Sequence, residues 1–400
     1  MMKQNDSANV SAEKADGCLI VKLRGQIDSS NAPRVEADID RFRAEAPSAP
    51  VTVDCDELKY MSSAGLRILL RMKKSAPELR LVNVSSEVYE VLEMTGFTEM
   101  MDVQKAFRKL SVEGCEVIGQ GANGKVYRID RDTIVKVYLN PDSLPEIKRE
   151  RELARTAFVL GVPTAIPYDV VRIEGGGYGS VFELLDASSF GQLLISGEKT
   201  VDELVEMSIE LLRLIHSTLV KPDSMPDMKG IALHWADFLK DYLPAEHFQK
   251  LHDLVAAVPE DNRMLHGDYH LKNVMYVNGE SLLIDMDTLC HGHPVFELAS
   301  MYNAYRGFHE LDPENAPSFL GIDYDTSGEI WNKSLVRYLG TTDEETIRDV
   351  EKKAMIIGYT RLMRRRIRRN GFDSETGRRE IECYKKHLEE LLPQVDTLVF

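Results

Sequence analysis

Residues 266–287 read HGDYHLKNVMYVNGESLLIDMD, and this stretch carries most of the chemical information in the chain. Asp268 and Asn273 stand five residues apart in a polar loop, and the short apolar run at 281–284 ends directly before Asp285. Phosphoryl transfer needs one carboxylate beside the acceptor hydroxyl, together with a carboxylate and a carboxamide that hold the metal bridging the nucleotide phosphates. The spacing therefore predicts Asp268 as the catalytic base and Asn273 and Asp285 as metal ligands.

A histidine and an aspartate in a loop are more often turn or capping residues than catalysts, so this stretch is not decisive alone. A second motif lies upstream. Residues 119–126 read GQGANGKV between apolar residues with strand preference, and Lys136 follows in the apolar stretch 135–138. Glycines let a backbone approach phosphates closely, and a strand lysine pairs with them. An ordinary β-hairpin is the better explanation of the glycines taken alone. All three motifs in this order predict a nucleotide site at Gly119, Gly121, Gly124, Val126 and Lys136.

The lysine needs an acidic partner on the helix that follows. The stretch PEIKRERELA opens a charged helix with Ile147, Ala154 and Phe158 expected on its buried side. Glu150 stands three residues after Ile147 and four before Ala154, so we choose Glu150, with Glu152 second. A solvated glutamate that forms i,i+4 pairs is the alternative interpretation.

Residues 177–186 read GYGSVFELLD and predict a strand that runs into a linker. A nucleotide base could bond to the backbone in this stretch. We therefore assign Glu183 and Leu185 to the expected nucleotide site.

These motifs resemble those of the aminoglycoside phosphotransferase and choline kinase group of the protein-kinase-like fold, over residues of about 114–390. The resemblance implies a two-lobed α+β domain, with an N-lobe at 114–185 and a C-lobe with acceptor-binding helices at 186–395. It implies ATP and Mg2+ as cofactors, with magnesium held by Asn273 and Asp285. It also implies that Asp268 is the catalytic base and that Lys136, supported by Glu150, contacts the α and β phosphates.

Protein kinases differ from this chain in the segment that corresponds to residues 266–287, here called the metal loop. They usually carry HRD, DFG and a later APE, whereas this chain has HGD at 266–268, DMD at 285–287 and no APE afterwards. The difference favours a small-molecule acceptor over a protein acceptor.

The identity of the acceptor does not follow from the sequence. In such enzymes the acceptor binds between the metal loop and the C-terminal helices, here at about 291–385. Five carboxylates could form an acidic pocket for a cationic acceptor: Asp287, Glu297, Asp312, Glu314 and Asp323. Six arginines are the opposite signal: Arg361, Arg364, Arg365, Arg366, Arg368 and Arg369. They could bind an anionic acceptor or an acidic partner, but a solvated basic face or a contact with the acidic first domain is the favoured interpretation.

Strand and helix signals alternate in the first hundred residues. Strand character is present at 18–27, 51–55 and 79–84, and helix patterns are present at 29–46, 62–74 and 86–95. The alternation predicts a small α/β domain with helices packed on a mixed sheet. The preceding residues 1–14 are polar and are expected to be disordered or flexible.

Residues of about 15–108 resemble the STAS domain of anti-sigma factor antagonists, on the stretches GQID (25–28), LKYMSSAGLR (58–67) and LEMTGF (92–97). The resemblance implies a protein partner and phosphorylation of Ser63, at the start of the second helix. A phosphate there would put charge on a docking surface and disrupt binding. Alternatively, Ser62 or Ser63 only caps the helix, and Ser62 stands where many family members have aspartate.

Composition bounds the remaining possibilities. A chain of 400 residues exceeds what one core usually supports. The net charge of −16 argues against nucleic acid as a partner. No apolar run approaches the length that spans a membrane, and the N-terminal stretch lacks a signal-peptide core, so we expect a cytoplasmic protein with no membrane contact. The five cysteines are scattered without metal spacing, which predicts reduced thiols and no zinc site, including at Cys290 near His291 and His293.

Two functions of different classes follow from the sequence. The first is an ATP-dependent phosphotransferase acting on an alcohol group of a small acceptor, with the STAS domain as regulator. The second is a signalling protein whose STAS domain binds a partner, while its kinase-like half senses nucleotide or phosphorylates Ser63. Because Lys136, Asp268, Asn273 and Asp285 are all present, we favour the enzyme.

Overall fold

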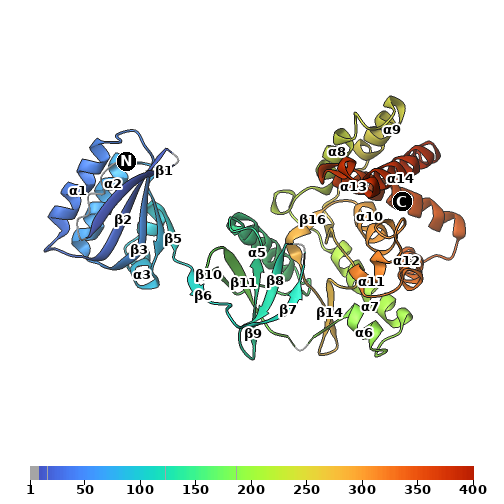
Figure 1. Ribbon diagram of the computed structural model, residues 1–400, viewed down its shortest axis with the longest axis horizontal. Helices are drawn as coiled ribbons and strands as arrows, with labels where there is room; N and C mark the ends of the chain where they lie inside the picture. The colour runs from blue at the N-terminus through green and yellow to red at the C-terminus, as the bar shows by residue number, and fades with distance from the viewer. Residues whose placement is uncertain (1–8, 16, 122, 186) are drawn as a thin grey trace. The chain divides into compact units, whose positions relative to one another are not determined.

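The computed structural model describes residues 9–15, 17–121, 123–185 and 187–400 (Figure 1). The chain divides into two compact units, the first ending at Ser111 and the second beginning at Val112. Within the described ranges, none of the helices combines the length and apolar character needed to cross a bilayer.

The first unit is built on a mixed five-stranded sheet in the order β1-β2-β3-β4-β5. β1 pairs antiparallel with β2, whereas β2, β3, β4 and β5 run parallel to one another. The strands are β1 (Val10–Ala15), β2 (Cys18–Ile27), β3 (Val51–Met61), β4 (Arg80–Val84) and β5 (Asp102–Lys105), and the short β6 (Arg108–Leu110) follows them. The small α/β domain predicted from the sequence is therefore present.

The start of this sheet differs from the expectation. Residues 1–14 were expected to be flexible, but Val10 already begins β1, which pairs along its whole length with β2. Val10 is fully buried, so its side chain belongs to the core of the unit. Residues 1–8 of the same segment lie outside the described residues.

Four helices pack on the sheet: α1 (Ala32–Ala44), α2 (Ser63–Ser75), α3 (Ser86–Met94) and α4 (Phe97–Met100). Proline lies in the first turn of α1, and the side chain of Ser85 caps α3 by accepting from the N–H of Val88. Leu69, Leu81 and Leu92 come from a helix, a strand and a helix and are fully buried together in one core.

The second unit begins with an antiparallel sheet in which five strands follow the order β10-β11-β9-β8-β7. The strands are β7 (Glu116–Gln120), β8 (Gly124–Arg128), β9 (Thr133–Tyr138), β10 (Asp169–Ile173) and β11 (Tyr178–Glu183). Helix α5 (Leu144–Val159) lies beside this sheet (Figure 1). These elements form the smaller lobe of the unit.

Helix α5 buries a narrower face than the sequence predicted. Ile147, Glu150 and Ala154 are buried as expected, but the side chain of Phe158 is 55% exposed. The buried face runs on through Ala157 instead. Phe158 lies one position beyond that face, in the last turn of the helix.

The larger lobe is helical. Its helices are α6 (Phe190–Ile195), α7 (Val201–Ser217), α8 (Met228–Phe238), α9 (Ala245–Ala256), α10 (Val295–Tyr302), α11 (Asn315–Leu320), α12 (Tyr324–Leu339), α13 (Glu344–Arg368) and α14 (Glu375–Leu391). Short helical turns are η1 (Pro222–Ser224), η2 (Met286–Thr288), η3 (Asn303–Gly307), η4 (Gly371–Asp373) and η5 (Leu392–Gln394). Every residue of α10 is buried, which is typical of a helix enclosed by its neighbours.

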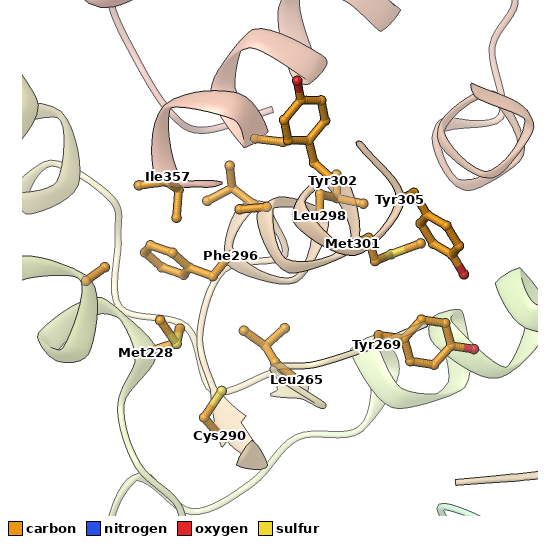
Figure 2. Close-up of a cluster of buried hydrophobic side chains, with 14 of the residues drawn as sticks. Met228, Leu265, Tyr269, Cys290, Phe296, Leu298, Met301, Tyr302, Tyr305 and Ile357 are labelled. Atoms are coloured by element: carbon orange, nitrogen blue, oxygen red, sulfur yellow. The ribbon is translucent and has the colours of Figure 1, made fainter. Parts of the chain in front are cut away.

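Figure 2 shows the packing around α10. Phe296 lies near Met228 and Ile357, which come from α8 and α13, so the central helix joins distant parts of the chain in one core. Tyr269 and Tyr305 flank the same cluster, and the hydroxyl of Tyr305 accepts a hydrogen bond from the backbone N–H of Leu271 at 3.1 Å. The polar loop that begins at His266 is therefore anchored on a rigid core.

Four short strands surround that loop: β13 (Met264–Leu265), β14 (Val274–Val277), β15 (Glu280–Leu283) and β16 (Cys290–His291). β13 pairs with β16, and β14 pairs with β15 and with β12 (Ser188–Ser189). Asn278 and Gly279 join β14 to β15 with positive φ values of 51° and 93°. An Asn-Gly pair in this conformation is the preferred connection of a tight β-hairpin.

Candidate active site

The centre of the site is an ion pair between the sheet and α5. Nζ of Lys136, on β9, donates to Oε1 of Glu150 at 3.0 Å. The second carboxylate oxygen of Glu150 accepts from the hydroxyl of Tyr138 at 2.7 Å, and that hydroxyl is 3.2 Å from the hydroxyl of Ser180. Glu150 is buried, as its predicted place on the inward face of α5 requires. The structure therefore brings together the lysine and the glutamate chosen from the sequence.

Lys136 also contacts Asp285, which lies just after β15. Its Nζ donates to Oδ1 of Asp285 at 2.7 Å. Burial disfavours the charged amine, but the carboxylates of Asp285 and Glu150 outweigh burial and raise the pKa of Lys136 above its ordinary value. Asp285 has a positive φ of 61°, a left-handed conformation that is uncommon outside glycine. Such conformations cluster at functional sites, where the surrounding structure holds them.

The β14–β15 hairpin explains why Asn273 and Asp285 meet. Asn273 directly precedes β14, and Ile284 follows β15; the backbone N–H of Ile284 donates to the carbonyl oxygen of Asn273 at 3.0 Å. The tight Asn-Gly turn sets this register, since a two-residue connection leaves little freedom for slippage. Two residues far apart in the loop are thereby held at the same edge of the hairpin.

Asp268 lies in a loop that is tied down on both sides. The backbone N–H of Asp268 donates to Nδ1 of His266 at 3.3 Å, and Nε2 of His266 is 3.1 Å from the carbonyl oxygen of Ile284. Oδ2 of Asp268 is 3.5 Å from Nε2 of His270, and Oδ1 is 3.9 Å from a guanidinium nitrogen of Arg361. Burial would raise the pKa of Asp268, but His270 and Arg361 outweigh burial and hold it well below its usual range.

A buried glutamate supports this loop from beneath. The carboxylate of Glu297, on α10, accepts from the backbone N–H groups of His266 and Gly267. Gly267 has a φ of +80°, and a Cβ there would lie 2.5 Å from the carbonyl oxygen of Thr288. Only glycine fits this position without displacing the backbone.

The acidic pocket considered in the sequence does not form. Glu297 is fully buried and bonded to the loop backbone, so it cannot face an acceptor. Asp323 caps α12, and Asp312 and Glu314 are exposed on the surface. Of the five carboxylates, Asp287 is the one that lines the cavity of about 210 Å³ beside the loop. Arg361 lines the same cavity. The five carboxylates do not share one pocket, because packing buries one, uses one as a helix cap and leaves two on the surface. The sequence does not show which carboxylate has which environment.

The donor set near Asp285 fits a divalent cation. The amide nitrogen of Asn273 donates to the carbonyl oxygen of Asp268 at 2.9 Å, which leaves its Oδ1 available as a ligand. Oδ1 of Asp285 pairs with Lys136, and oxygen ligands of this kind suit Mg2+. Burial and the neighbouring carboxylate of Asp285 raise the pKa of Asp287 to about 6. A divalent cation would relieve this concentration of negative charge.

The glycine loop is a turn between β7 and β8. The N–H of Gly121 donates to the carbonyl oxygen of Gly124 at 2.9 Å, and a Cβ on Gly124 would collide with the carbonyl oxygen of Val137. A Cβ on Gly121 would meet nothing within 4 Å, and one on Gly119 would only touch Val126. Close strand packing thus requires glycine at one position of the loop, while Ala122 lies outside the described residues.

The tip of the glycine loop also contacts the metal loop. The side-chain amide of Asn123 donates to Oδ2 of Asp287 at 3.2 Å, across 164 residues of sequence. Asp287 and Arg361 are thus two residues near the site to which the sequence analysis gave no catalytic or metal role. In the sequence, Asp287 is the second aspartate of the DMD motif and Arg361 begins the arginine run. The sequence analysis assigned Asp287 to a possible acidic pocket, and the arginines to a solvated basic face or a contact with the first domain.

The expected base-binding segment is the end of β11 and the residues after it. β11 ends at Glu183, whose side chain is exposed, and Leu185 is partly buried. The N–H of Leu184 donates to the carbonyl oxygen of Asp132 at 2.8 Å. The neighbouring Asp186 lies outside the described residues.

The start of α2 in the first unit distinguishes the two serines. Ser62 is the N-cap, and its hydroxyl accepts from the N–H of Ala64 at 3.2 Å. Ser63 is the first helical residue, and its side chain is exposed. The capping role therefore belongs to Ser62, and the hydroxyl of Ser63 takes no part in it.

Cys383 lies close to a glutamate and a histidine, a cluster that the sequence analysis did not predict. Among the described residues, ligand atoms of Glu310, Cys383 and His387 lie within 4.8 Å of one another. Glu310 already accepts from Tyr359 at 2.9 Å and is 2.6 Å from Nε2 of His387. The hydrogen bond between Glu310 and His387 accounts for the contact of these two side chains.

The fold and the site together define a phosphotransferase domain preceded by a small α/β domain. The model of the phosphotransferase enzyme family matches residues 114–325, and the model of the STAS domain matches residues 9–111. Since the first match covers more than half of the chain, this protein belongs to the phosphotransferase enzyme family and carries an N-terminal STAS domain. Both resemblances stated from the sequence are confirmed.

Two curated relatives are similar to the STAS domain of this chain over most of their own length. The chain is 35% identical over 95 residues to the putative anti-sigma factor antagonist BtrV of Bordetella bronchiseptica, which covers 23% of this chain and 81% of that protein. It is 24% identical over 98 residues to the anti-sigma F factor antagonist of Paenibacillus polymyxa, which covers 24% of this chain and 84% of that protein.

Among solved structures, an apo form of a thermostable mutant of aminoglycoside phosphotransferase APH(4)-Ia is similar with 13% identity and a TM-score of 0.49, over 70% of this chain and 94% of that chain. A choline/ethanolamine kinase family protein from Mesorhizobium loti is similar with 14% identity and a TM-score of 0.44, over 70% of this chain and 87% of that chain.

Proposed function

We propose that this protein is an ATP- and magnesium-dependent phosphotransferase that moves the γ-phosphate of ATP to a hydroxyl group of a small-molecule acceptor. Membership of the phosphotransferase enzyme family supports phosphate transfer. The observation that carries the finer proposal is the contact of Lys136 with both Glu150 and Asp285, beside the loop that holds Asp268. A partly buried cation positioned by two carboxylates at a glycine loop is suited to nucleotide phosphates.

Each side chain has a distinct role in this proposal. Lys136, held by Glu150, contacts the α and β phosphates. Asp268 stays ionised because its pKa is low, so it accepts a hydrogen bond from the acceptor hydroxyl and orients the oxygen toward the γ-phosphorus. The oxygen–phosphorus bond forms as the bond from the γ-phosphorus to the bridging oxygen breaks, releasing ADP, and Asp268 takes the proton.

Two further parts of the site complete the proposal. Asn273 and Asp285 would hold magnesium, which supplies neutralisation of phosphate charge when bound. The glycine loop, including Gly121 and Gly124, would cover the phosphates, and the backbone at Glu183 and Leu185 would bond the base. In this scheme the N-lobe comprises residues 114–185 and the C-lobe residues 186–395.

The direct test measures ADP release by the full-length protein with magnesium and ATP, using small alcohols, aminoglycosides and choline-like amines as acceptors. Asp268→Ala should abolish turnover and retain nucleotide binding, whereas Asp241→Ala, at an exposed surface position, should not change turnover. Removing magnesium with EDTA should stop the reaction reversibly. An Asp268→Ala variant that still turns over an acceptor would remove Asp268 from its assigned role.

A second function, in signalling, is favoured by one observation at the start of α2. The hydroxyl of Ser63 is exposed and free of the capping role, so it is accessible to a kinase. A phosphate at this position would alter a surface through which the STAS domain binds a protein partner. The five free cysteines fit the reducing cytoplasm in which such a system would act.

The signalling function is tested by intact mass and peptide mapping after incubation with magnesium and ATP. Phosphate on Ser63 in the wild type, absent from Asp268→Ala and Ser63→Ala, would support self-modification. An unchanged mass in all three proteins would exclude it under those conditions and leave the small-molecule reaction.

A further inference from the structure

The C-terminal half of α13 presents arginines to a cavity. Arg361, Arg364, Arg365 and Arg368 follow one another at intervals of three, one and three residues, which places them on one side of a helix. Together with Arg369 and Trp235 they line a cavity of about 410 Å³. Leu362, Met363 and Ile367 point into the core on the other side. The periodicity gives this helix one apolar face and one cationic face.

Most of these arginines lack an anionic partner. Arg366 pairs with Glu380 outside the cavity. In the described part of the chain, Arg364, Arg365, Arg368 and Arg369 form no ion pair with any carboxylate, although the protein has 65 acidic residues and a net charge of −16. Nε of Arg364 is buried and has no hydrogen-bond partner among the described residues. Four guanidinium groups of the cavity therefore have no carboxylate within ion-pair distance in the described residues, so they are available to an anionic ligand.

Aromatic rings hold these guanidinium groups in place. The guanidinium of Arg361 lies 5.6 Å from the ring centroid of Trp235, that of Arg364 lies 5.6 Å from Phe238, and that of Arg365 lies 4.8 Å from Phe308. A guanidinium held against a ring keeps its N–H groups free to bind carboxylate or phosphate oxygens. Arg361, Arg364 and Arg365 are therefore preorganised by the rings, whereas Arg368 and Arg369 are exposed.

The arginine face begins at the catalytic loop. Arg361 donates to the carbonyl oxygen of Gly267 and to the hydroxyl of Ser300, each at 3.1 Å. It also lies 3.9 Å from Asp268 and lines both this cavity and the smaller one beside Asp287. From Arg361 to Arg368 the helix rises about 10 Å, at about 1.5 Å per residue. An acceptor of that length could reach from Asp268 to the last arginine.

We propose that the acceptor of this phosphotransferase is a hydroxylated small molecule carrying a carboxylate or phosphate group, which the face formed by Arg361, Arg364, Arg365, Arg368 and Arg369 binds while its hydroxyl lies at Asp268. The inference rests on the phosphotransferase function proposed above and deepens it. A cationic acceptor would meet like charges along this face. The favourable position of the last-turn arginines at the negative helix end explains Arg365 and Arg368 in part, but not Arg361 or Arg364.

The mutual repulsion of the arginines agrees with this assignment, and Arg361 and Arg364 are partly buried while Arg365, Arg368 and Arg369 are exposed. Burial and the neighbouring Arg368 lower the pKa of Arg364, and burial with Arg369 and Arg361 lowers that of Arg365. An anion bound between them would offset this repulsion. A solvated basic face, the interpretation favoured by the sequence, needs neither a cavity nor a buried donor.

The test compares probes that share one carbon skeleton and differ in charge. Binding of glucose 6-phosphate, gluconate, glucose and glucosamine to the full-length protein is measured by calorimetry, with magnesium and a non-hydrolysable ATP analogue at saturation. We expect one or both anions to bind at least about tenfold more tightly than glucose, and glucosamine to bind most weakly. The two anions separate a phosphate-reading site from a carboxylate-reading site.

Variants assign the effect to the cavity. Arg365→Met/Arg368→Met removes two exposed charges and keeps the apolar stems, so the fold should be retained; anion affinity should fall about tenfold or more. Arg348→Met is the matched control, because Arg348 lies on the same helix, is exposed and pairs with Glu344 away from the cavity. It should bind the anions like the wild type.

The outcomes separate this inference from the function on which it rests. The proposal of an anionic acceptor would be overturned if the affinities did not follow charge, which includes weak binding of both anions. It would also be overturned if the wild type and the double variant bound the anions equally. Phosphorylation of glucosamine or glucose with ADP release would then show that the phosphotransferase function stands without it. Charge-dependent binding without any turnover would support the anion site and leave the proposed transfer as the failed part.

Discussion

Nζ of Lys136 lies 2.7 Å from Oδ1 of Asp285, although 149 residues separate them in the chain. The same nitrogen lies 3.0 Å from Glu150. One partly buried cation thus links the sheet, α5 and the segment after β15, and the two carboxylates keep it charged. An anionic nucleotide would compete with Asp285 for this lysine, so the pair is placed to exchange partners when phosphates bind.

Replacing Lys136 with methionine should lower kcat/KM for ATP by about 100-fold or more, because the charge that contacts the phosphates in our proposal is lost. It should also leave Glu150 buried without its cationic partner, which lowers stability. Steady-state kinetics and urea unfolding measure both effects. Lys148→Met, at an exposed position of α5, is the control. A Lys136→Met variant with wild-type kcat/KM would contradict the phosphate role.

Asp268→Asn should reduce kcat by about 100-fold to 10,000-fold, because the amide keeps the size of the side chain but cannot take the proton of the hydroxyl. The affinity for ATP should change little, since Asp268 contacts the acceptor rather than the nucleotide in our proposal. Single-turnover kinetics combined with nucleotide titration separate the two effects. Equal losses of ATP affinity and of turnover would place Asp268 at the nucleotide instead.

Gly124→Ala should destabilise the second unit by about 1–3 kcal/mol, because its Cβ would collide with the carbonyl oxygen of Val137 on β9. Gly121→Ala is the matched control for stability, since its Cβ would meet nothing within 4 Å. Thermal unfolding of both variants provides the comparison. If the two variants lose stability equally, close strand packing is not the reason for glycine at 124.

Glu297→Gln should destabilise the protein at neutral pH by about 3 kcal/mol, because the amide loses the negative charge and places an NH2 group where a carboxylate oxygen now accepts from the N–H of Gly267. Burial would raise the pKa of Glu297, but the imidazoles of His216 and His266 and the N–H of Gly267 outweigh burial and lower it.

The pH dependence of this difference has a defined sign. Because the folded-state pKa of Glu297 is lowered, its stabilisation is complete above the unfolded value of about 4.3 and is lost as the pH falls through the folded value. Urea midpoints of wild type and Glu297→Gln should therefore converge only in acid, below about pH 4. A constant difference down to the lowest accessible pH would show that the carboxylate does not titrate in this way.

Local patterns in the sequence were sufficient for much of the site. Asn273 and Asp285 are held together by one hairpin whose Asn-Gly turn is readable in the sequence, and Glu150 follows from the helical period of α5. Phe158 shows the limit of that period, because the period places it on the buried side whereas the packing of the helix leaves its side chain 55% exposed.

By itself, the sequence determined the two domains, the phosphotransferase family and the residues from which the site is built, because these are expressed in short motifs with local geometry. Only the tertiary structure decided that Glu297 supports the loop at His266 across 31 residues of sequence, and that Arg361 reaches Gly267 across 94. Charge patterns alone cannot make that distinction, since a carboxylate or an arginine gains its role from burial and from the partner that packing places against it.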